Sequence, residues 1–322
     1  TEAARFILKS SLSVSDVEIA NIRSIGYEAW LDTQMDAAIA QTGVAWLSAR
    51  GYDQIKIDEF YFQDYPGDYM IWNQLMSDAN GVRKRVALAL SEFFVVSLTG
   101  LDFQWRSQAI AFYWDQLNSN AFGNFRKLLE DVTLNPAMGY YLSTLGNRKE
   151  DVRLGRVPDE NYAREVMQLF TIGLFQLNND GSRKLDANGQ PLETYTNADV
   201  TNLARVFTGY GSDWTGNVRT PSVRFPNFQV DGMNPVLKPM TIDPTKWVWP
   251  QTDTEHSMLE ATFLGTTIPA NTDGTVALKT ALDALFNHAN VGPFFARQMI
   301  QRLVTSNPSA AYVNRVANVF NN

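Results

Sequence analysis

The sequence contains no cysteine, only two histidines and no apolar run as long as a membrane-spanning helix. Without cysteine, disulfides, thiolate nucleophiles, zinc ribbons and iron–sulfur ligation are excluded. With only His256 and His288, a three-histidine metal site cannot be built within one chain, so any metal would need mostly oxygen ligands. The apolar stretch 88–98 is too short to cross a bilayer, and we expect no transmembrane segment in this chain.

The charge balance is acidic. The chain has 27 basic and 34 acidic residues, which give a net charge of −7. This balance argues against a general nucleic-acid binder and against docking on an anionic membrane surface. At 322 residues and 45% hydrophobic content, the chain can bury a large core, as one big domain or as two tightly joined halves.

Helical periodicity dominates the chain, which predicts a mainly α fold in one large multi-helix domain over residues 1–322. Turn signals at 179–181 and 186–189 predict a short β-hairpin after a central helix at 158–173. Residues 210–255 lack helical periodicity and are rich in tryptophan, which predicts one long aromatic loop. The other predicted helices lie within 2–40 (three short ones), 80–97, 102–120, 124–134, 196–208, 275–286, 292–304 and 309–320.

The central helix has clear start and stop signals. Pro158 suits the first turn, where its missing N–H costs nothing, and Gly173 suits the end. At about 100° per residue, six polar side chains share an arc of roughly 140° on this helix. They are Glu160, Asn161, Arg164, Glu165, Gln168 and Thr171.

This polar face contains no lysine, although solvated helix faces are usually built from lysine and glutamate. Its carboxylates, guanidinium, amides and hydroxyl are typical of groups that hydrogen-bond one another away from bulk water. One interpretation is structural, either a buried network or a simple Glu160–Arg164 pair at i, i+4. The other is a face that contacts ligand or substrate.

Two later helices repeat the pattern. A capping box at Thr196 and Asp199 opens a helix on which Thr201 and Arg205 share one side with two further polar residues. We expect Arg205 to face Glu165, either as a buried pair or across a cleft. A third polar face carries Arg297 with neighbouring amides and Arg302.

A basic run at 147–156 precedes the central helix. The simple interpretation is a solvated connector. The functional interpretation is an anion clamp that closes over Glu160 and Arg164.

Several segments together resemble a bacterial family known as domain of unknown function 1800. They occur in the family's order and cover most of the chain. The segments include 85–92, 161–165, 195–200, 203–209 and 296–303. The resemblance implies export, commonly through a twin-arginine signal, and a companion exported protein of sulfatase-like type. It implies no established chemistry, and the cofactor stays unknown.

The departures from the family pattern concern three positions. Family members commonly have histidine where this chain has Asn135 and Phe170, and lysine where it has Ala261. If those residues serve catalysis in relatives, this chain is altered or inactive. Members also usually begin with an export signal and continue past Phe320, so we expect a longer natural chain at both ends.

Two functions compete. The first is an exported hydrolase or lyase for a glycan or other polyhydroxylated or anionic substrate, in which Glu165 and Glu160 carry acid/base chemistry. Its ligand-binding residues would be Asn161, Arg164, Gln168, Thr201, Arg205 and Arg297. The second is a non-catalytic structural or partner-binding protein of the cell envelope. A weaker third hypothesis places a metal between Glu165, Asp199 and His256.

Overall fold

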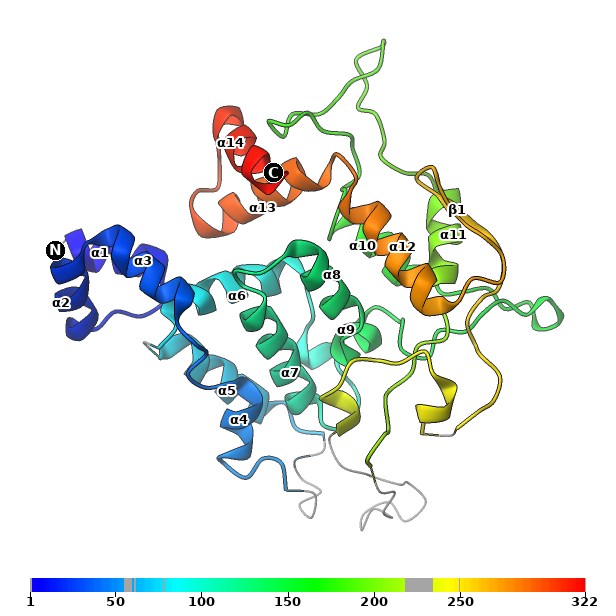
Figure 1. Ribbon diagram of the computed structural model, residues 1–322, viewed down its shortest axis with the longest axis horizontal. Helices are drawn as coiled ribbons and strands as arrows, with labels where there is room; N and C mark the ends of the chain where they lie inside the picture. The colour runs from blue at the N-terminus through cyan, green and yellow to red at the C-terminus, as the bar shows by residue number, and fades with distance from the viewer. Residues whose placement is uncertain are drawn as a thin grey trace. The chain divides into compact units, whose positions relative to one another are not determined.

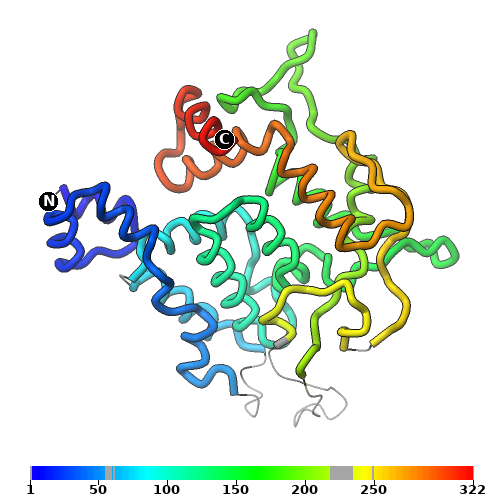
Figure 2. The backbone as a smooth tube through the Cα atoms, viewed as in Figure 1, coloured from blue at the N-terminus to red at the C-terminus, as the bar shows by residue number. Residues whose placement is uncertain are grey.

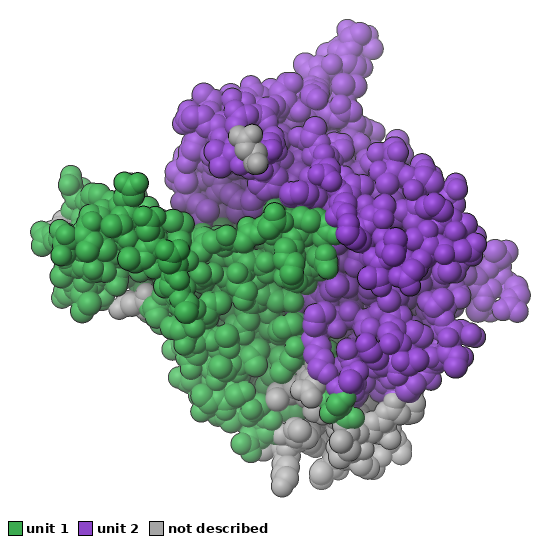
Figure 3. Space-filling model, viewed as in Figure 1, with its two compact units in different colours: residues 1–132, 216–237 green, residues 133–215, 238–322 purple. Residues whose placement is uncertain are grey.

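The computed structural model describes residues 2–54, 60, 62–77, 79–217, 234–248 and 250–321. About 53% of the chain is helical, in 14 α-helices within this described part, so the predicted mainly α class is confirmed. The only regular sheet among the described residues has two antiparallel strands (Figure 1). The chain divides into two compact units, residues 1–132 with 216–237, and residues 133–215 with 238–322 (Figure 3).

The first unit is built from short helices around α7. Its elements are α1 (Glu2–Ser10), α2 (Asp16–Ile25), α3 (Tyr27–Asp36), α4 (Gly43–Ser48), α5 (Tyr65–Met76), α6 (Gly81–Phe93), η2 (Leu98–Gly100), α7 (Arg106–Ser119), α8 (Phe125–Thr133) and η4 (Asn234–Val236). Helix α7 packs against α4, α5 and α6, and its buried residues include Tyr113, Trp114 and Leu117. Such burial on several sides is expected of a central helix that is hydrophobic around most of its circumference.

A half-buried carboxylate joins α4 to α7. Asp115 of α7 accepts the backbone N–H of Gly43 at 2.6 Å and that of Val44 at 3.0 Å. These are two of the N–H groups that a helix leaves without internal partners in its first turn. Sequence periodicity predicted no helix between residues 40 and 80 and so missed α4, whose first-turn N–H groups are bonded both locally by Thr42 and by Asp115 from far along the chain.

The second unit contains the predicted central helix. Its elements are α9 (Pro136–Tyr141), η3 (Val152–Leu154), α10 (Asn161–Gln168), α11 (Asn197–Val206), η5 (Pro244–Lys246), β1 (Ala261–Phe263), β2 (Thr266–Ile268), α12 (Gly274–Phe286), α13 (Val291–Leu303) and α14 (Ala310–Phe320). Helix α10 packs on α11, α11 packs on β1, and α13 packs on α14.

The central helix is shorter than its sequence signals predict. Helix α10 ends at Gln168, and the chain turns through Gly173, whose φ is +69°. Its buried side holds Tyr162, which contacts Phe207 with ring centroids 4.8 Å apart and shares a hydrogen bond of 2.7 Å with Thr133. Thr171 was therefore wrongly placed on the polar face, since it lies beyond the helix, fully buried, and donates to the carbonyl of Val166.

The predicted hairpin is a long ribbon rather than a pair of regular strands. Antiparallel bridges join Phe175 to Glu193, Leu177 to Arg183 and Leu185 to Pro191. Figure 2 traces this ribbon, residues 174–194, from the end of α10 past α14 and back toward α11. The regular strands are instead β1 and β2, paired from Ala261 with Ile268 to Phe263 with Thr266, which the sequence did not reveal.

The predicted long loop lies only partly within the described residues. Residues 218–233 and Trp249 lie outside them. In the described remainder, Gly211 forms an antiparallel bridge with Thr241, and Trp247 donates its indole N–H to the carbonyl of Thr241 at 3.1 Å. The loop therefore has fixed backbone contacts around Trp247.

Candidate functional site

The polar sides of α10 and α11 meet. Glu160, at the N-terminus of α10, accepts the hydroxyl of Thr201 at 2.7 Å through one oxygen and Arg164 at 3.1 Å through the other. Arg164 also reaches the amide oxygen of Asn197 at 3.4 Å. The polar faces of the two helices therefore meet at these four residues. Both oxygens of Glu160 are occupied, so this carboxylate holds the two helices in register.

The capping box expected at the start of α11 is confirmed. Thr196 accepts the N–H of Asp199 at 3.4 Å, and Asp199 accepts the N–H of Thr196 at 2.7 Å. The second oxygen of Asp199 accepts the N–H of Leu264 at 2.7 Å, beside β1. These hydrogen bonds hold the pKa of Asp199 below its usual value against the effect of burial. The box thus fixes the direction in which α11 presents Thr201.

Arg205 does not form the expected buried pair with Glu165. Arg205 donates to the side-chain oxygen of Asn202 and to the carbonyl of Glu260, both at 2.7 Å. Its position on α11 turns it toward the segment that leads into β1, which a helical wheel cannot anticipate. Arg205 therefore ties α11 to that segment.

The third polar face contacts the ribbon through Arg297. Arg297 donates to the carbonyl of Gly181 in the ribbon at 3.4 Å, and Arg302 donates to Gln298 of its own helix at 2.5 Å. Spacing on α13 predicted which residues share a side. This side of α13 is bonded to the ribbon through Arg297.

Glu165 differs from Glu160 although both belong to the same face. Its Oε2 is buried and accepts no hydrogen bond from the described residues. Burial raises the pKa of this carboxyl group above its usual value, and the neighbouring Arg164 opposes the rise. An unpaired, partly desolvated carboxylate is costly, and such groups concentrate at functional sites.

The next turn of α10 supplies neighbours for Glu165. Gln168 accepts the phenol of Tyr195 at 3.1 Å, and Tyr195 is half-buried. Burial raises the pKa of Tyr195, Arg164 lowers it, and the charge of Glu165 raises it. Asn161 lies exposed at the start of the helix. The site therefore contains a carboxyl group, a guanidinium, a phenol and two amides on adjoining elements.

The basic run is not the predicted clamp over Glu160 and Arg164. Arg148 pairs with Glu255 at 3.1 Å, and Lys149 donates to the carbonyl of Thr254 at 2.6 Å. Arg156 donates to the carbonyl of Lys149 at 2.8 Å. This segment is a connector fastened to residues 254–255.

The proposed metal site between Glu165, Asp199 and His256 is not assembled. No cluster of three or more potential metal-binding side chains of His, Cys, Asp or Glu occurs in the part of the chain that the structure describes. The carboxylate of Asp199 is engaged with Thr196 and Leu264, and His256 lies against Thr208.

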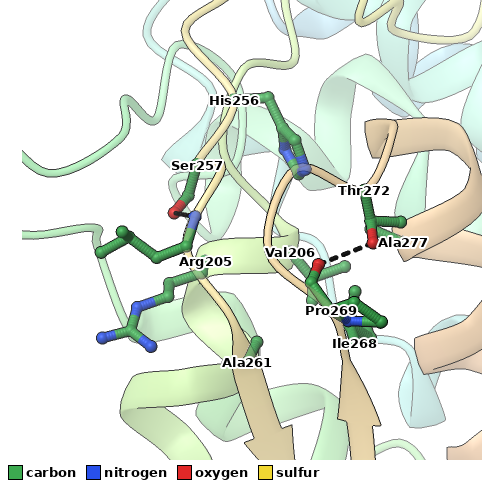
Figure 4. Close-up of a pocket in the computed structure, with 10 residues that line it drawn as sticks. Arg205, Val206, His256, Ser257, Ala261, Ile268, Pro269, Thr272 and Ala277 are labelled. Carbon is green, nitrogen blue, oxygen red and sulfur yellow. Dashed lines mark hydrogen bonds between the residues drawn. The ribbon is translucent and has the colours of Figure 1, made fainter.

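A second polar cluster surrounds His256, and the sequence did not point to it. The Nδ1 atom of His256 lies 3.0 Å from the carbonyl of Thr208, and Ser257 donates to both oxygens of Glu150 at 3.0 and 2.9 Å. Burial lowers the pKa of His256, so the ring is neutral, and the carbonyl contact places its proton on Nδ1. In Figure 4 the ring points toward Thr272, whereas Ser257 and Arg205 point away from it.

The cavity beside His256 is small, about 10 Å3, which is the space for one water. The close approach of Gly209 to the backbone of His256 explains this tight packing, since an added Cβ would lie 2.6 Å from the His256 nitrogen. The sequence offered two signals for this cluster. Histidine is rare, with only two in the chain, and Thr208-Gly209 marks the end of a predicted helix. The cluster has no room for a substrate.

The three positions at which we expect departures from the family pattern are all buried. Asn135 caps α9 by accepting the N–H of Ala137 at 2.8 Å. Phe170 is 0% exposed and Ala261 is 2% exposed. None of the three can transfer a proton, so these positions serve packing and capping in this protein.

The protein is mainly α. Its candidate site is the face of α10 that packs on α11, where the carboxyl group of Glu165 has one buried oxygen without a hydrogen bond from the described residues. The family model described as "Protein of unknown function (DUF1800)" matches residues 5–322. The chain therefore belongs to this family. No curated protein and no solved structure matches it significantly. None of the described helices has the length and apolar character needed to span a bilayer.

Proposed function

We propose that this protein is an acid/base enzyme, a hydrolase or lyase, that acts on a glycan or another polyhydroxylated or anionic substrate. The observation that carries the proposal is Glu165, whose Oε2 is buried and accepts no hydrogen bond from the described residues while its pKa is raised. General acids and bases need a pKa close to the working pH, and desolvation is the usual way to raise that of a carboxyl group.

Each neighbour has a distinct part in this proposal. In hydrolysis, protonated Glu165 gives its proton to the leaving oxygen as the bond to carbon breaks, and water supplies the hydroxyl group and the proton that restores the acid. Glu160 is a positioning residue, because Thr201 and Arg164 occupy both its oxygens. Arg164, with 40% of its side chain exposed, remains able to bind an anionic group.

The second candidate is a non-catalytic envelope protein that binds a companion exported protein of sulfatase-like type. It is favoured by the closed set of hydrogen bonds between Glu160, Arg164, Asn197 and Thr201, which is typical of a structural network. An exported location, periplasmic, at the cell surface or extracellular, is part of both candidates and rests on the resemblance noted in the sequence. Cell fractionation of the native host tests it, and a purely cytoplasmic pool would contradict it.

The discriminating experiment compares Glu165→Gln with Glu160→Gln and the parent protein on a panel of envelope polysaccharides and esters. We expect Glu165→Gln to lose at least about 100-fold in kcat, as removal of a general acid commonly does. Glu160→Gln is expected to lose less and to lower the melting temperature. Unchanged turnover in a folded Glu165→Gln variant would overturn the proposed role.

A second measurement needs no substrate. NMR titration of the Glu165 carboxyl carbon is expected to give a pKa above that of exposed glutamates, and Arg164→Gln is expected to raise it further, because Arg164 favours the charged form. A normal pKa for Glu165 would remove the basis of the proposal.

A further inference from the structure

We infer that a groove between the ribbon and the ends of α12 and α14 is a binding site for an acidic oligosaccharide. The groove has a volume of about 580 Å3, and its lining residues include Asn178, Asn179, Lys184, Phe286, His288 and Phe320. That volume lies within the range of roughly 300 to 1,000 Å3 that is typical of ligand sites. None of its lining residues belongs to the Glu165 site, so this inference goes beyond the proposed function.

The walls of the groove are held in place by buried and bridging amides. Asn290, 2% exposed, donates to the carbonyls of Ile172 and Phe175, both at 2.8 Å, and accepts the N–H of Leu177. Asn179 donates to the side chains of Asn314 at 2.7 Å and Asn318 at 2.8 Å. The ribbon is thereby fixed to both helix regions, and the groove exists before any ligand binds.

The lining combines apolar rings with amides. Phe286 and Phe320 lie with ring centroids 6.2 Å apart and present aromatic surface of the kind that packs on the C–H face of a sugar ring. Amides both donate and accept hydrogen bonds, and so do sugar hydroxyl groups. Since Asn179 is engaged with α14, the exposed amides of Asn178 and Asn287 form the rim, and amides beside an aromatic surface suit a polyhydroxylated ring better than a peptide or a lipid chain.

The charge of the groove favours an acidic ligand. Among the described residues its lining contains Lys184 and no carboxylate side chain, in a chain whose net charge is −7. The Nδ1 atom of His288 accepts the backbone N–H of Asn290 at 3.2 Å, which places the ring proton on Nε2 as a donor. One ammonium and one imidazole N–H match a single carboxylate, as in a uronic acid, whereas a phosphate site usually gathers several cations or backbone N–H groups.

Binding is tested by calorimetry on the whole chain with an oligogalacturonate, the matching neutral galactan oligosaccharide, a poly-glutamate peptide and inorganic phosphate. We expect the oligogalacturonate to bind, the neutral sugar to bind at least fivefold more weakly, and the peptide and phosphate not to bind. No binding of the oligogalacturonate at millimolar concentration would overturn the inference, as would equal binding of peptide or phosphate.

Substitutions at exposed positions change the groove without disturbing the fold. Asn178→Asp introduces a negative charge into the groove and is expected to weaken binding of the acidic sugar at least fivefold, with little effect on the neutral sugar. Lys184→Gln is expected to act likewise. The matched controls are Asn188→Asp in the same ribbon and Lys279→Gln on α12, which lie outside the groove lining and should bind normally.

Controls that weaken binding as much as the groove variants would contradict the location. Glu165→Gln is expected to bind the oligogalacturonate like the parent protein. Unchanged turnover in a folded Glu165→Gln variant contradicts the proposed function alone, whereas unchanged binding of the oligogalacturonate in Asn178→Asp contradicts this inference alone.

Discussion

Two partly desolvated carboxyl groups, one in each unit, have opposite surroundings. Asp115 of the first unit accepts backbone N–H groups through both oxygens, whereas Glu165 of the second unit has a buried oxygen that accepts none from the described residues. Burial raises the pKa of both, to about 6 for Asp115. A raised pKa therefore does not by itself distinguish a structural carboxylate from one available for chemistry.

The hydrogen-bond partners make that distinction. For Asp115 the bonds from Val44 and Gly43 lower the pKa against the effect of burial and join α7 to α4. For Glu165 only the charge of Arg164 opposes the rise. The first group gives its bonding capacity to the fold, whereas the buried oxygen of the second accepts no hydrogen bond from the described residues.

The largest effect is expected from Asp115→Ala. This change leaves two helix N–H groups without a partner and opens a cavity, so we expect a loss of about 3 kcal/mol in the free energy of unfolding. Chemical denaturation measures it. Asp64→Ala, which removes an acidic side chain that makes no cap hydrogen bond at the start of α5, is the control. A loss below about 1 kcal/mol for Asp115→Ala would show that α4 does not depend on this cap.

The pH dependence of stability sharpens the same comparison. The pKa of Asp115 rises from 3.8 in the unfolded chain to about 6 in the fold, so the folded state binds more protons between these values. Its contribution is fully present below about pH 4 and is lost as the pH rises through about 6.

We expect Asp115→Asn to flatten this part of the stability profile, measured by denaturation at several pH values. The Asn side chain cannot titrate, so a slope between pH 4 and 6 equal to that of the parent protein would assign the dependence to other groups.

A smaller effect is expected from Glu160→Gln. The change weakens the bonds to Thr201 and Arg164, which are only partly buried, and should cost about 1 kcal/mol. Thr201→Val should cost a similar amount. The double variant should cost less than the sum of the two, because both changes remove one interaction. Strict additivity would mean that Glu160 does not join the two helices.

The smallest effect on stability is expected from Glu165→Gln. Because no bond from the described residues is lost and a partly desolvated charge is removed, the free energy of unfolding at pH 7 should change by less than about 0.5 kcal/mol or increase. The sign follows from the raised pKa, since the charged form is the disfavoured one in the fold. A loss as large as that of Asp115→Ala would make Glu165 a structural residue.

The sequence predicted most helices of the fold because their apolar periodicity is local. Examples are α6, α12 and α14, whose observed bounds lie close to the predicted ones. It also predicted the capping box of α11. It missed the helices α4, α5 and α9, and the strands β1 and β2, which are three residues each. Strands this short depend on contacts made elsewhere in the chain.

The candidate site was predicted only in part. Helical spacing placed Glu160, Arg164 and Glu165 on one face, but it could not show that Glu160 is fully bonded and Glu165 is not. It also gave Arg205 the wrong partner, since the carbonyl of Glu260 lies 55 residues away in sequence. Partners on a separate element have no fixed spacing in the chain.

The sequence by itself determined the class of fold, the ends of its longer helices, the family and the polar face of α10, because helix periodicity and capping act over a few residues. The tertiary structure alone decided which groups of that face have hydrogen-bond partners and which groups the basic side chains of residues 147–156 bind. It also decided that a groove forms beside Phe320. Burial and hydrogen-bond completion depend on atoms from distant segments, and it is these two quantities that separate Glu165 from Glu160 and Asp115.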